Sequence, residues 1–93
     1  MVVASLTLAF LVPGCRSLKE KRHVVKSLKD RIRSRFNVSV AEVDFQDLWQ
    51  RGTLGVAVVS SDGHAARRAL EEVIRFVRQD MRLSLLDEII EFR

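Results

Sequence analysis

The sequence predicts a single α+β domain, residues 1–93, in which six elements follow the order βαββαβ. Two apolar runs are long and continuous enough to form central strands of a sheet. Two further segments repeat apolar residues at the three-to-four spacing of a helix. Hydrophobic residues make up 47% of the 93 positions, which is enough for one modest core and excludes a disordered chain.

The first half of the chain is predicted to hold a strand, residues 2–12, and a helix, residues 17–36. "PGCR" ends the strand, because proline and glycine interrupt regular structure. "SLKE" then matches a capping box, in which the Ser17 hydroxyl accepts from the Glu20 amide and the Glu20 carboxylate accepts from the Ser17 amide. Asn37 is expected to close the helix in the left-handed conformation.

The remaining elements are three strands and one helix. The strand at residues 38–45 changes the face on which its apolar residues lie, which predicts a bulge near Ala41. After it the sequence predicts a turn at 46–52, a strand at 53–60, a helix at about 64–79 capped by Ser61 or Asp62, and a strand at 83–92.

Right-handed crossovers convert this order into the split-βαβ, or ferredoxin-like, fold: a four-stranded antiparallel sheet with both helices on one face. The first and third strands then lie in the middle of the sheet. The other face stays open and keeps apolar side chains in either orientation, which predicts a homodimer. The two possible sets are Leu54, Val56 and Val58, or Gly55, Ala57 and Val59, joined by Val3, Ala9 and Leu11 or their opposites on the first strand.

Positive charge is concentrated in the predicted first helix and its approach. Residues 16–36 hold nine of the sixteen Lys and Arg residues and two of the twelve acids, so they carry +7 while the other residues sum to −3. On a helical wheel the apolar residues share one arc, and a line of cations, here called the basic row, lies beside it. The row is about 21 Å long at a rise of about 1.5 Å per residue, and only Asp30 lies near it. Its members are Lys19, Arg22, Lys26, Lys29 and Arg33.

Two interpretations of the basic row remain open. It is either the solvated face of a helix or a surface that binds a polyanion, with RNA the leading ligand. An acidic protein or an acidic membrane surface would satisfy the same charge. Lys21 and Arg35 point toward the apolar arc, and we expect their charged ends to extend past the core into water.

Three residues near the ends of the first and third strands could add contacts. Trp49, the single tryptophan, falls in the turn after the second strand, where it could stack on a base or anchor a partner. The alternatives are that it folds over the sheet edge or is buried in a dimer. Arg16 and Arg51 are the other possible accessory contacts. Base stacking on the sheet, as in RNA-recognition motifs, is not expected, because the two central strands offer only Phe10.

No catalytic residue, metal site or cofactor is predicted. Cys15 precedes a helix, but no acid–base partner can be placed beside it from the sequence, because the only histidines are His23 and His64. Arg16 lies in the loop that binds phosphate in acylphosphatases, but the rest of their signature is missing. A short acidic cluster lacks any His or Cys, so it indicates a solvated hairpin edge: Glu42, Asp44 and Asp47.

The segment "MVVASLTLAFLVPGC" faintly resembles a lipoprotein signal ending at Cys15. It lacks the basic residues that precede the apolar run of a signal, and it is too short to span a bilayer as a helix. Ser5 and Thr7 alternate with apolar residues, as in a strand. One cysteine cannot form an internal disulfide, so a reducing, cytoplasmic location without membrane contact is expected.

Four segments, "SLKEKR", "RFNVSVAEVD", "QDLWQR" and "LGVAVVS", together resemble the YlxP-like family of bacterial proteins, a domain of unknown function. The likeness covers nearly the whole chain and is densest over Pro13–Asp62. The resemblance implies a ferredoxin-like fold in a small cytoplasmic protein, and a gene often found among translation-initiation and ribosome-maturation genes. It implies no activity, ligand or catalytic residue, and Cys15 is not part of the family's pattern.

The leading hypothesis is therefore a non-catalytic, RNA- or ribosome-associated binding domain that uses the basic row. The second is a homodimeric structural or regulatory module that binds an acidic protein. The third is a small phosphate-handling enzyme that depends on Arg16.

Overall fold

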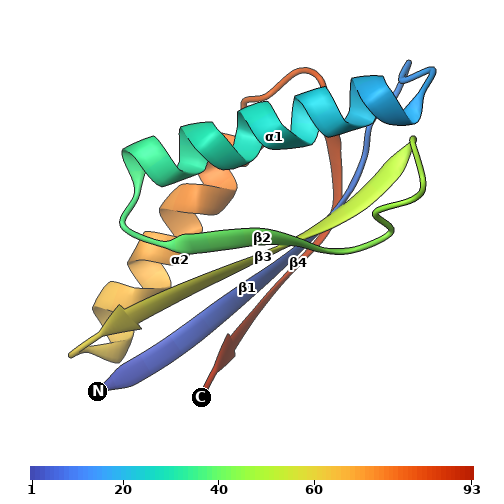
Figure 1. The fold of residues 1–93 in the computed structure, drawn as a ribbon. Helices are drawn as coiled ribbons and strands as arrows, with labels where there is room; N and C mark the ends of the chain where they lie inside the picture. The colour runs from blue at the N-terminus through green and yellow to red at the C-terminus, as the bar shows by residue number, and fades with distance from the viewer.

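The computed structural model describes residues 1–93 and has the predicted order of elements, βαββαβ (Figure 1). The molecule is elongated, with principal extents of 42 × 21 × 17 Å. Both chain termini lie at the same end of it. The elements are β1 (Val2–Leu11), α1 (Leu18–Arg35), β2 (Ser39–Asp44), β3 (Arg51–Ser60), α2 (Gly63–Arg78) and β4 (Ser84–Phe92).

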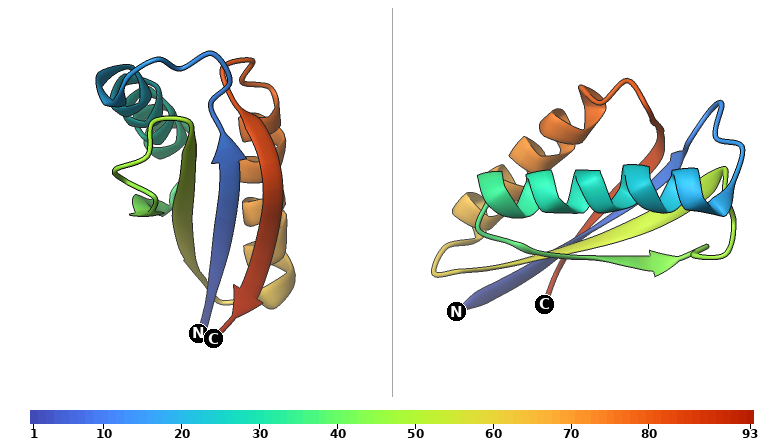
Figure 2. Two further views of the ribbon diagram at one scale, coloured as in Figure 1. Left: turned by 90° about the vertical axis from the view of Figure 1, so that its right-hand side faces the viewer. Right: turned by 45° about the horizontal axis from the view of Figure 1, so that its top comes forward.

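The four strands form one antiparallel sheet in the order β2-β3-β1-β4, so the ferredoxin-like arrangement is confirmed. The two most apolar strands, β1 and β3, are central, as their composition predicts. They pair over their whole length, from Val2 opposite Ser60 to Leu11 opposite Arg51. Both helices cover the same face of the sheet, α1 over the β2 side and α2 over the middle and the β4 side (Figure 2).

The core lies between this face and the two helices. Alternate residues of the central strands point into it, among them Leu6, Leu8 and Leu54, none of which is exposed. Gly52 lies against the ring of Phe10, because a Cβ at that position would stand 2.6 Å from the Phe10 Cζ atom. Glycine is therefore required there by the close approach of an aromatic side chain.

The start of α1 follows the prediction in part. The Ser17 hydroxyl accepts from the Glu20 amide at 3.1 Å, as expected of an N-cap. The expected return bond to the Ser17 amide is wrong: the Glu20 carboxylate accepts from the amide of Arg16 instead, at 2.8 Å. The extended backbone of Ser17 (φ −158°) places the preceding amide, rather than its own, within reach of the first helical turn.

The end of α1 differs from the prediction. Asn37 is not left-handed, because Phe45 is the only non-glycine residue with positive φ. The helix closes instead at Phe36, whose backbone is extended and whose amide donates to the carbonyl of Ile32 at 2.9 Å. The Phe36 ring packs edge-on against Phe76 of α2, so the extended exit keeps this ring on the core.

The bulge in β2 occurs later than the sequence predicts. The pairing with β3 shifts between Glu42 and Asp44, so the inserted residue is Val43 rather than Ala41. Val43 lies on the open face, against Gly55. The change of face along the strand correctly predicted a bulge in β2, but the predicted position, Ala41, was wrong. Of the two residues expected to cap α2, Ser61 and Asp62, the N-cap is Asp62. Its carboxylate accepts a hydrogen bond from the His64 amide at 3.1 Å.

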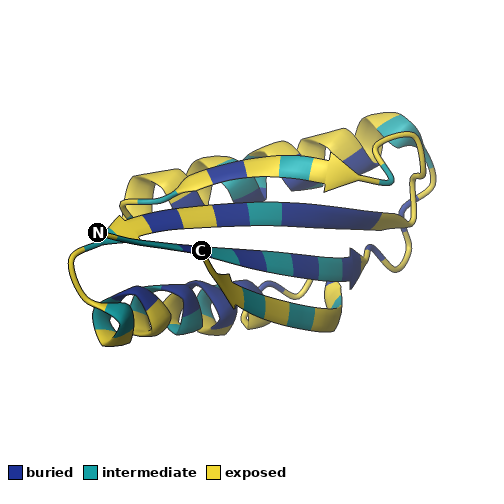
Figure 3. Cartoon of the chain, turned by 90° about the horizontal axis from the view of Figure 1, so that it is seen from below, coloured by how far each residue is buried: buried dark blue, intermediate teal, exposed yellow.

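The uncovered face of the sheet is seen directly in Figure 3. The strand register resolves the two alternatives for its side chains: Leu54, Val56 and Val58 are buried under the helices. The open face therefore carries Gly55, Ala57 and Val59 with Val3, Ala9 and Leu11. Its exposed apolar side chains include Val59 (66%), Val43 (55%) and Ile89 (49%). Neither helix has the length and apolar composition needed to cross a lipid bilayer.

Candidate functional site

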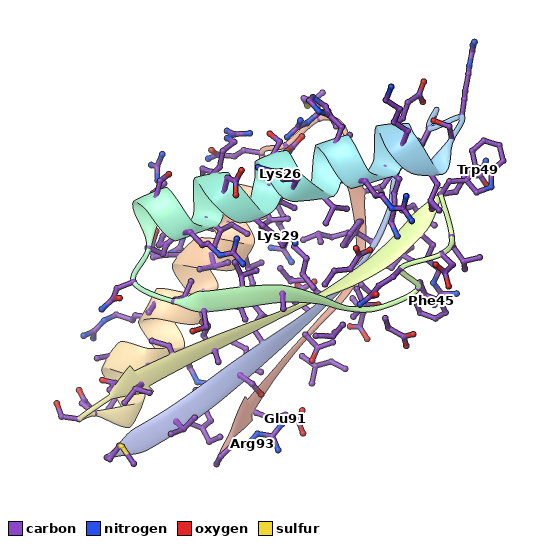
Figure 4. The ribbon with its side chains drawn as sticks, in the orientation of Figure 1. Lys26, Lys29, Phe45, Trp49, Glu91 and Arg93 are labelled. Atoms are coloured by element: carbon purple, nitrogen blue, oxygen red, sulfur yellow. The ribbon has the colours of Figure 1, made fainter.

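All five cations of the basic row lie on α1, which crosses one side of the molecule with its outer surface free of other elements (Figures 1 and 4). Four of the side chains are exposed, and Lys29 is half-buried. The helix is held to the sheet by a buried stripe next to the row, formed by Val25, Leu28 and Ile32. The row is thus presented to solvent by residues that fix the rotation of the helix about its axis.

Only one acidic side chain neutralises the row. Asp30 accepts from Lys26 at 2.8 Å and lies 3.8 Å from the guanidinium of Arg33. The hydrogen bond from Lys26 holds the pKa of the Asp30 carboxyl below its ordinary value, and the charges of Lys26, Arg33 and Lys29 act in the same direction. Lys19, Arg22 and Lys29 form no ion pair.

Arg33 is also tied to the fold. Its guanidinium donates to the carbonyl of Val40 on β2 at 2.8 Å, which anchors the end of α1 to the edge strand. Four members of the row border one surface hollow of about 460 Å³ between α1 and β2, with Asp30 and Glu42 on its wall: Arg22, Lys26, Lys29 and Arg33. Lys19 borders a different cleft, at the start of the helix.

Lys21 does not extend into water, and the expectation that it would is wrong. Its side chain has no exposed surface, and its ammonium donates to the carbonyl of Phe45 at 2.6 Å. The Glu42 carboxylate lies 2.7 Å from the same ammonium and is only 14% exposed. The buried Glu42 Oε2 accepts no well-aligned hydrogen bond, so attraction to the ammonium is what offsets its lost hydration.

This buried pair joins α1, β2 and the loop that follows β2. Phe45 has a left-handed backbone (φ 58°), which costs free energy for a residue with a side chain. Arg51 stacks on its ring, with 4.2 Å between the guanidinium carbon and the ring centroid. The pair could be found from the sequence only by noting that Lys21 falls in the middle of the apolar arc, where a charge needs a partner.

The predicted accessory residues gather where α1 begins. The amide of Val12 donates to the carbonyl of Gln50 at 2.8 Å, which brings the loop before α1 beside the loop before β3. Trp49 is 42% exposed and projects at this end of the molecule (Figure 4). Arg16 is exposed, whereas Arg51 is engaged with Phe45. Trp49 and Arg16 therefore lie at the Lys19 end of the basic row.

The cleft at the start of α1 contains two residues that the sequence did not place together. Cys15 and His23 both border it, although no partner for Cys15 was expected. The thiol is buried and donates to the carbonyl of Ser17 at 3.2 Å, so it is a structural hydrogen-bond donor here. Their shared place at this cleft was not evident from the sequence, because a short loop and less than two turns of helix separate the two residues.

The loop that carries Arg16 is less suited to phosphate than the likeness to acylphosphatases suggested. The Arg16 amide, which would donate to a phosphate in such a loop, already donates to the Glu20 carboxylate. The negative charge of Glu20 would repel an anion placed there. No group of three His, Cys, Asp or Glu side chains is arranged to hold a metal ion, and Glu42 is occupied by Lys21.

A second cationic cluster lies between the helices. The guanidinium carbons of Arg31 and Arg35 each lie 5.1 Å from the centroid of the Phe76 ring. Arg35 is exposed, in keeping with the expectation for its charged end. Arg31 also pairs at 3.6 Å with Asp80, which is hydrogen-bonded to Arg82. These arginines join α1 to α2 and the loop after it, and we assign them to packing rather than to the candidate surface.

Comparison with known proteins places the chain among proteins of unknown activity. A family model described as Protein of unknown function (DUF503) matches residues 3–89. The chain is 44% identical over 61 residues to the "Uncharacterized protein YlxP" of Bacillus subtilis (strain 168). That match covers 66% of this chain and 66% of the relative, just under two thirds of each. The family match covers nearly all of the chain, so this protein belongs to the DUF503 family of proteins of unknown function, as its YlxP-like motifs indicate.

Proposed function

We propose that this protein is a non-catalytic RNA-binding domain that contacts the phosphate backbone through the basic row. The observation that supports it most is that three of the five cations, Lys19, Arg22 and Lys29, form no ion pair with an acidic side chain. A helix face evolved only for solubility would pair its cations with acids at spacings of three and four residues. The five cations lie in line over about 21 Å and the three unpaired ones over about 15 Å, an arrangement that matches the backbone of a nucleic acid instead.

The surroundings of the row favour the same ligand. An exposed tryptophan, Trp49, lies at the Lys19 end, where it can stack on a base. We further propose that the protein acts in the cytoplasm on ribosomal RNA or an RNA bound to the ribosome, which is the setting that the likeness to the YlxP-like family implies.

The experiment that tests the row is charge reversal at Lys26 and Lys29. The double variant Lys26→Glu, Lys29→Glu should lose affinity for every RNA sequence by a similar factor, because contacts to phosphate position a ligand without reading its bases. Two reversals in a row of five cations should lower affinity by about 10- to 100-fold at low salt. Fluorescence anisotropy with a labelled single strand measures it.

The matched control is the same double reversal on the other helix. Arg67 and Arg68 on α2 are exposed and form no ion pair, so Arg67→Glu, Arg68→Glu changes the net charge equally. Affinity should change by less than about threefold in this control. Equal losses in the two double variants would show that only total charge matters, and retention of affinity by the α1 variant would identify the row as a solvated helix face.

The second candidate function is a homodimeric module that binds an acidic protein. It is favoured by the open face of the sheet, where Val59, Val43 and Ile89 leave about half or more of their surface in water. A shallow groove of about 330 Å³ with a floor of small residues, including Gly55 and Ala57, runs beside Val43. Raised valines beside a floor of small residues could interdigitate with a second copy.

Light scattering at high micromolar concentration tests this candidate. A dimer should give twice the monomer mass, and Val59→Glu should restore the monomer without loss of stability, because Val59 makes no core contact. A strictly monomeric mass for the unmodified protein would remove the dimer. Saturable binding to an acidic protein with no binding to RNA would favour this candidate over the first.

A further inference from the structure

An open cleft of about 490 Å³ lies where β1 leads into α1. It is within the range of volumes that hold small molecules, roughly 300–1,000 Å³. One wall is apolar and comes from the loop after β1 and from Val24 of α1, which is half-buried. The polar part of the lining includes Lys19 and His23 of α1 and Arg82 of the loop after α2. A planar group with an apolar face and polar edges is the kind of ligand that such walls can accept.

Lys19 connects this cleft to the basic row, since it is both the first member of the row and a rim residue of the cleft. A strand whose phosphates follow the row would therefore reach the cleft mouth. His23 is exposed on the rim, and imidazole rings are among the side chains on which RNA bases stack. Arg82 is fixed in place by hydrogen bonds to Asp80, so this part of the rim is rigid.

The negative charge of Glu20, which borders the cleft, determines which part of a nucleotide the cleft can accept. One of its carboxylate oxygens accepts from the Arg16 amide, and the other accepts no hydrogen bond within the protein. A negative charge on the cleft wall repels a phosphate but accepts readily from an amino group. The exocyclic amine of cytosine is a donor, and a carboxylate is its natural acceptor, whereas uracil presents an oxygen at the same position.

We propose that this cleft binds one unstacked base of a single-stranded RNA, preferring an amino-bearing base such as cytosine, while the phosphates beside that base lie on the basic row. The inference rests on the proposed RNA-binding function and adds to it a base-specific subsite. The phosphate row fixes the position of the strand, and the carboxylate of Glu20 accepts a hydrogen bond from the base.

The test compares three short strands of equal length at pH 7.5 and low salt: oligocytidine, oligouridine and an abasic strand. Their backbone charges are equal, so differences in affinity report on the base. The unmodified protein should bind oligocytidine about tenfold more tightly than oligouridine, the scale of one hydrogen bond to a charged acceptor. The abasic strand should bind more weakly than either.

Two variants separate the parts of the cleft. Glu20→Gln keeps an oxygen acceptor for the Arg16 amide but removes the charge, so the preference for cytosine should fall to less than about threefold. Val24→Phe fills the cleft, so all three strands should bind like the abasic one. Glu72→Gln, on the exposed face of α2, removes the same charge elsewhere and should leave the preference unchanged.

Each outcome decides between the proposals. Equal affinity for all three strands in the unmodified protein, together with weak binding by the Lys26→Glu, Lys29→Glu variant, would overturn the base subsite and leave the row as the RNA-binding surface. Unchanged cytosine preference in Glu20→Gln would overturn the role of its carboxylate. No binding of any strand at low salt would overturn the proposed function, and the subsite with it.

Discussion

Replacing Lys21 by methionine tests the buried pair that locks α1 to β2. Methionine fills a similar volume, so the change removes the charge with little loss of packing. The Glu42 carboxylate then stays in a site where it is only 14% exposed, without the ammonium that now lies 2.7 Å from it. The carbonyl of Phe45 also loses its donor at 2.6 Å.

The size of the effect follows from these two losses. Removing one partner of a buried ion pair costs about 3–5 kcal/mol, and the lower end applies because Glu42 keeps some contact with water. A partly buried carbonyl without its donor adds about 1 kcal/mol. We therefore expect Lys21→Met to lower the free energy of unfolding by roughly 3–4 kcal/mol, a large part of the stability of a domain of this size.

Urea denaturation followed by the fluorescence of Trp49 measures the change. Glu42→Leu should also destabilise the protein, because it leaves the fully buried ammonium with the Phe45 carbonyl alone. The double variant Lys21→Met, Glu42→Leu should recover most of the loss, since an apolar pair replaces a buried ionic one at little net cost. A loss of less than about 0.5 kcal/mol in the free energy of unfolding of Lys21→Met would refute the reasoning. It would show that the Lys21 ammonium is exposed to water in solution.

Three further predictions concern stability. Gly52→Ala should cost about 1–3 kcal/mol in urea denaturation, because the new methyl group would overlap the ring of the buried Phe10. Leu28→Glu should abolish the folded state in circular dichroism, since Leu28 has no exposed surface and its replacement buries a charge. The hydrogen bond from Arg82 holds the pKa of Asp80 below its ordinary value. The ionised Asp80 carboxylate therefore stabilises the fold above about pH 4. Its contribution to the free energy of unfolding is lost as the pH falls through the folded-state pKa. Urea titrations from neutral to acid pH should show a smaller fall in stability for Asp80→Asn, and an equal fall in both proteins would contradict it.

The order of the elements and the core were predictable because both follow from local periodicity. Leu70, Val73 and Val77 repeat at helical spacing, and the structure buries all three. The continuous apolar runs that became β1 and β3 could only be satisfied in the middle of a sheet. The local sequence also predicted the N-cap at Ser17, whose hydroxyl accepts a hydrogen bond from the amide of Glu20, three residues away.

The features that escaped prediction depend on contacts between distant segments. The partner of Lys21 is 21 positions away on β2, so no local rule could select Glu42 over another acid. The cleft that unites Cys15 with Arg82 requires the packing of two loops that are far apart in sequence. The helix ends at an extended Phe36 rather than at a left-handed Asn37 because the Phe36 ring packs against Phe76 of α2. Tertiary packing overrode the local preference in each case.

The salt dependence of RNA binding tests the central claim most directly. Each neutralised phosphate of a single strand contributes about −0.7 to the slope of log K against log salt. The three cations without ion pairs should then give a slope of about −2, and engagement of all five about −3.5. We predict a slope between these values for the unmodified protein, and a shallower one for Lys26→Glu, Lys29→Glu. A slope near zero, or equal slopes in the two proteins, would contradict the assignment of the basic row as an RNA-binding surface.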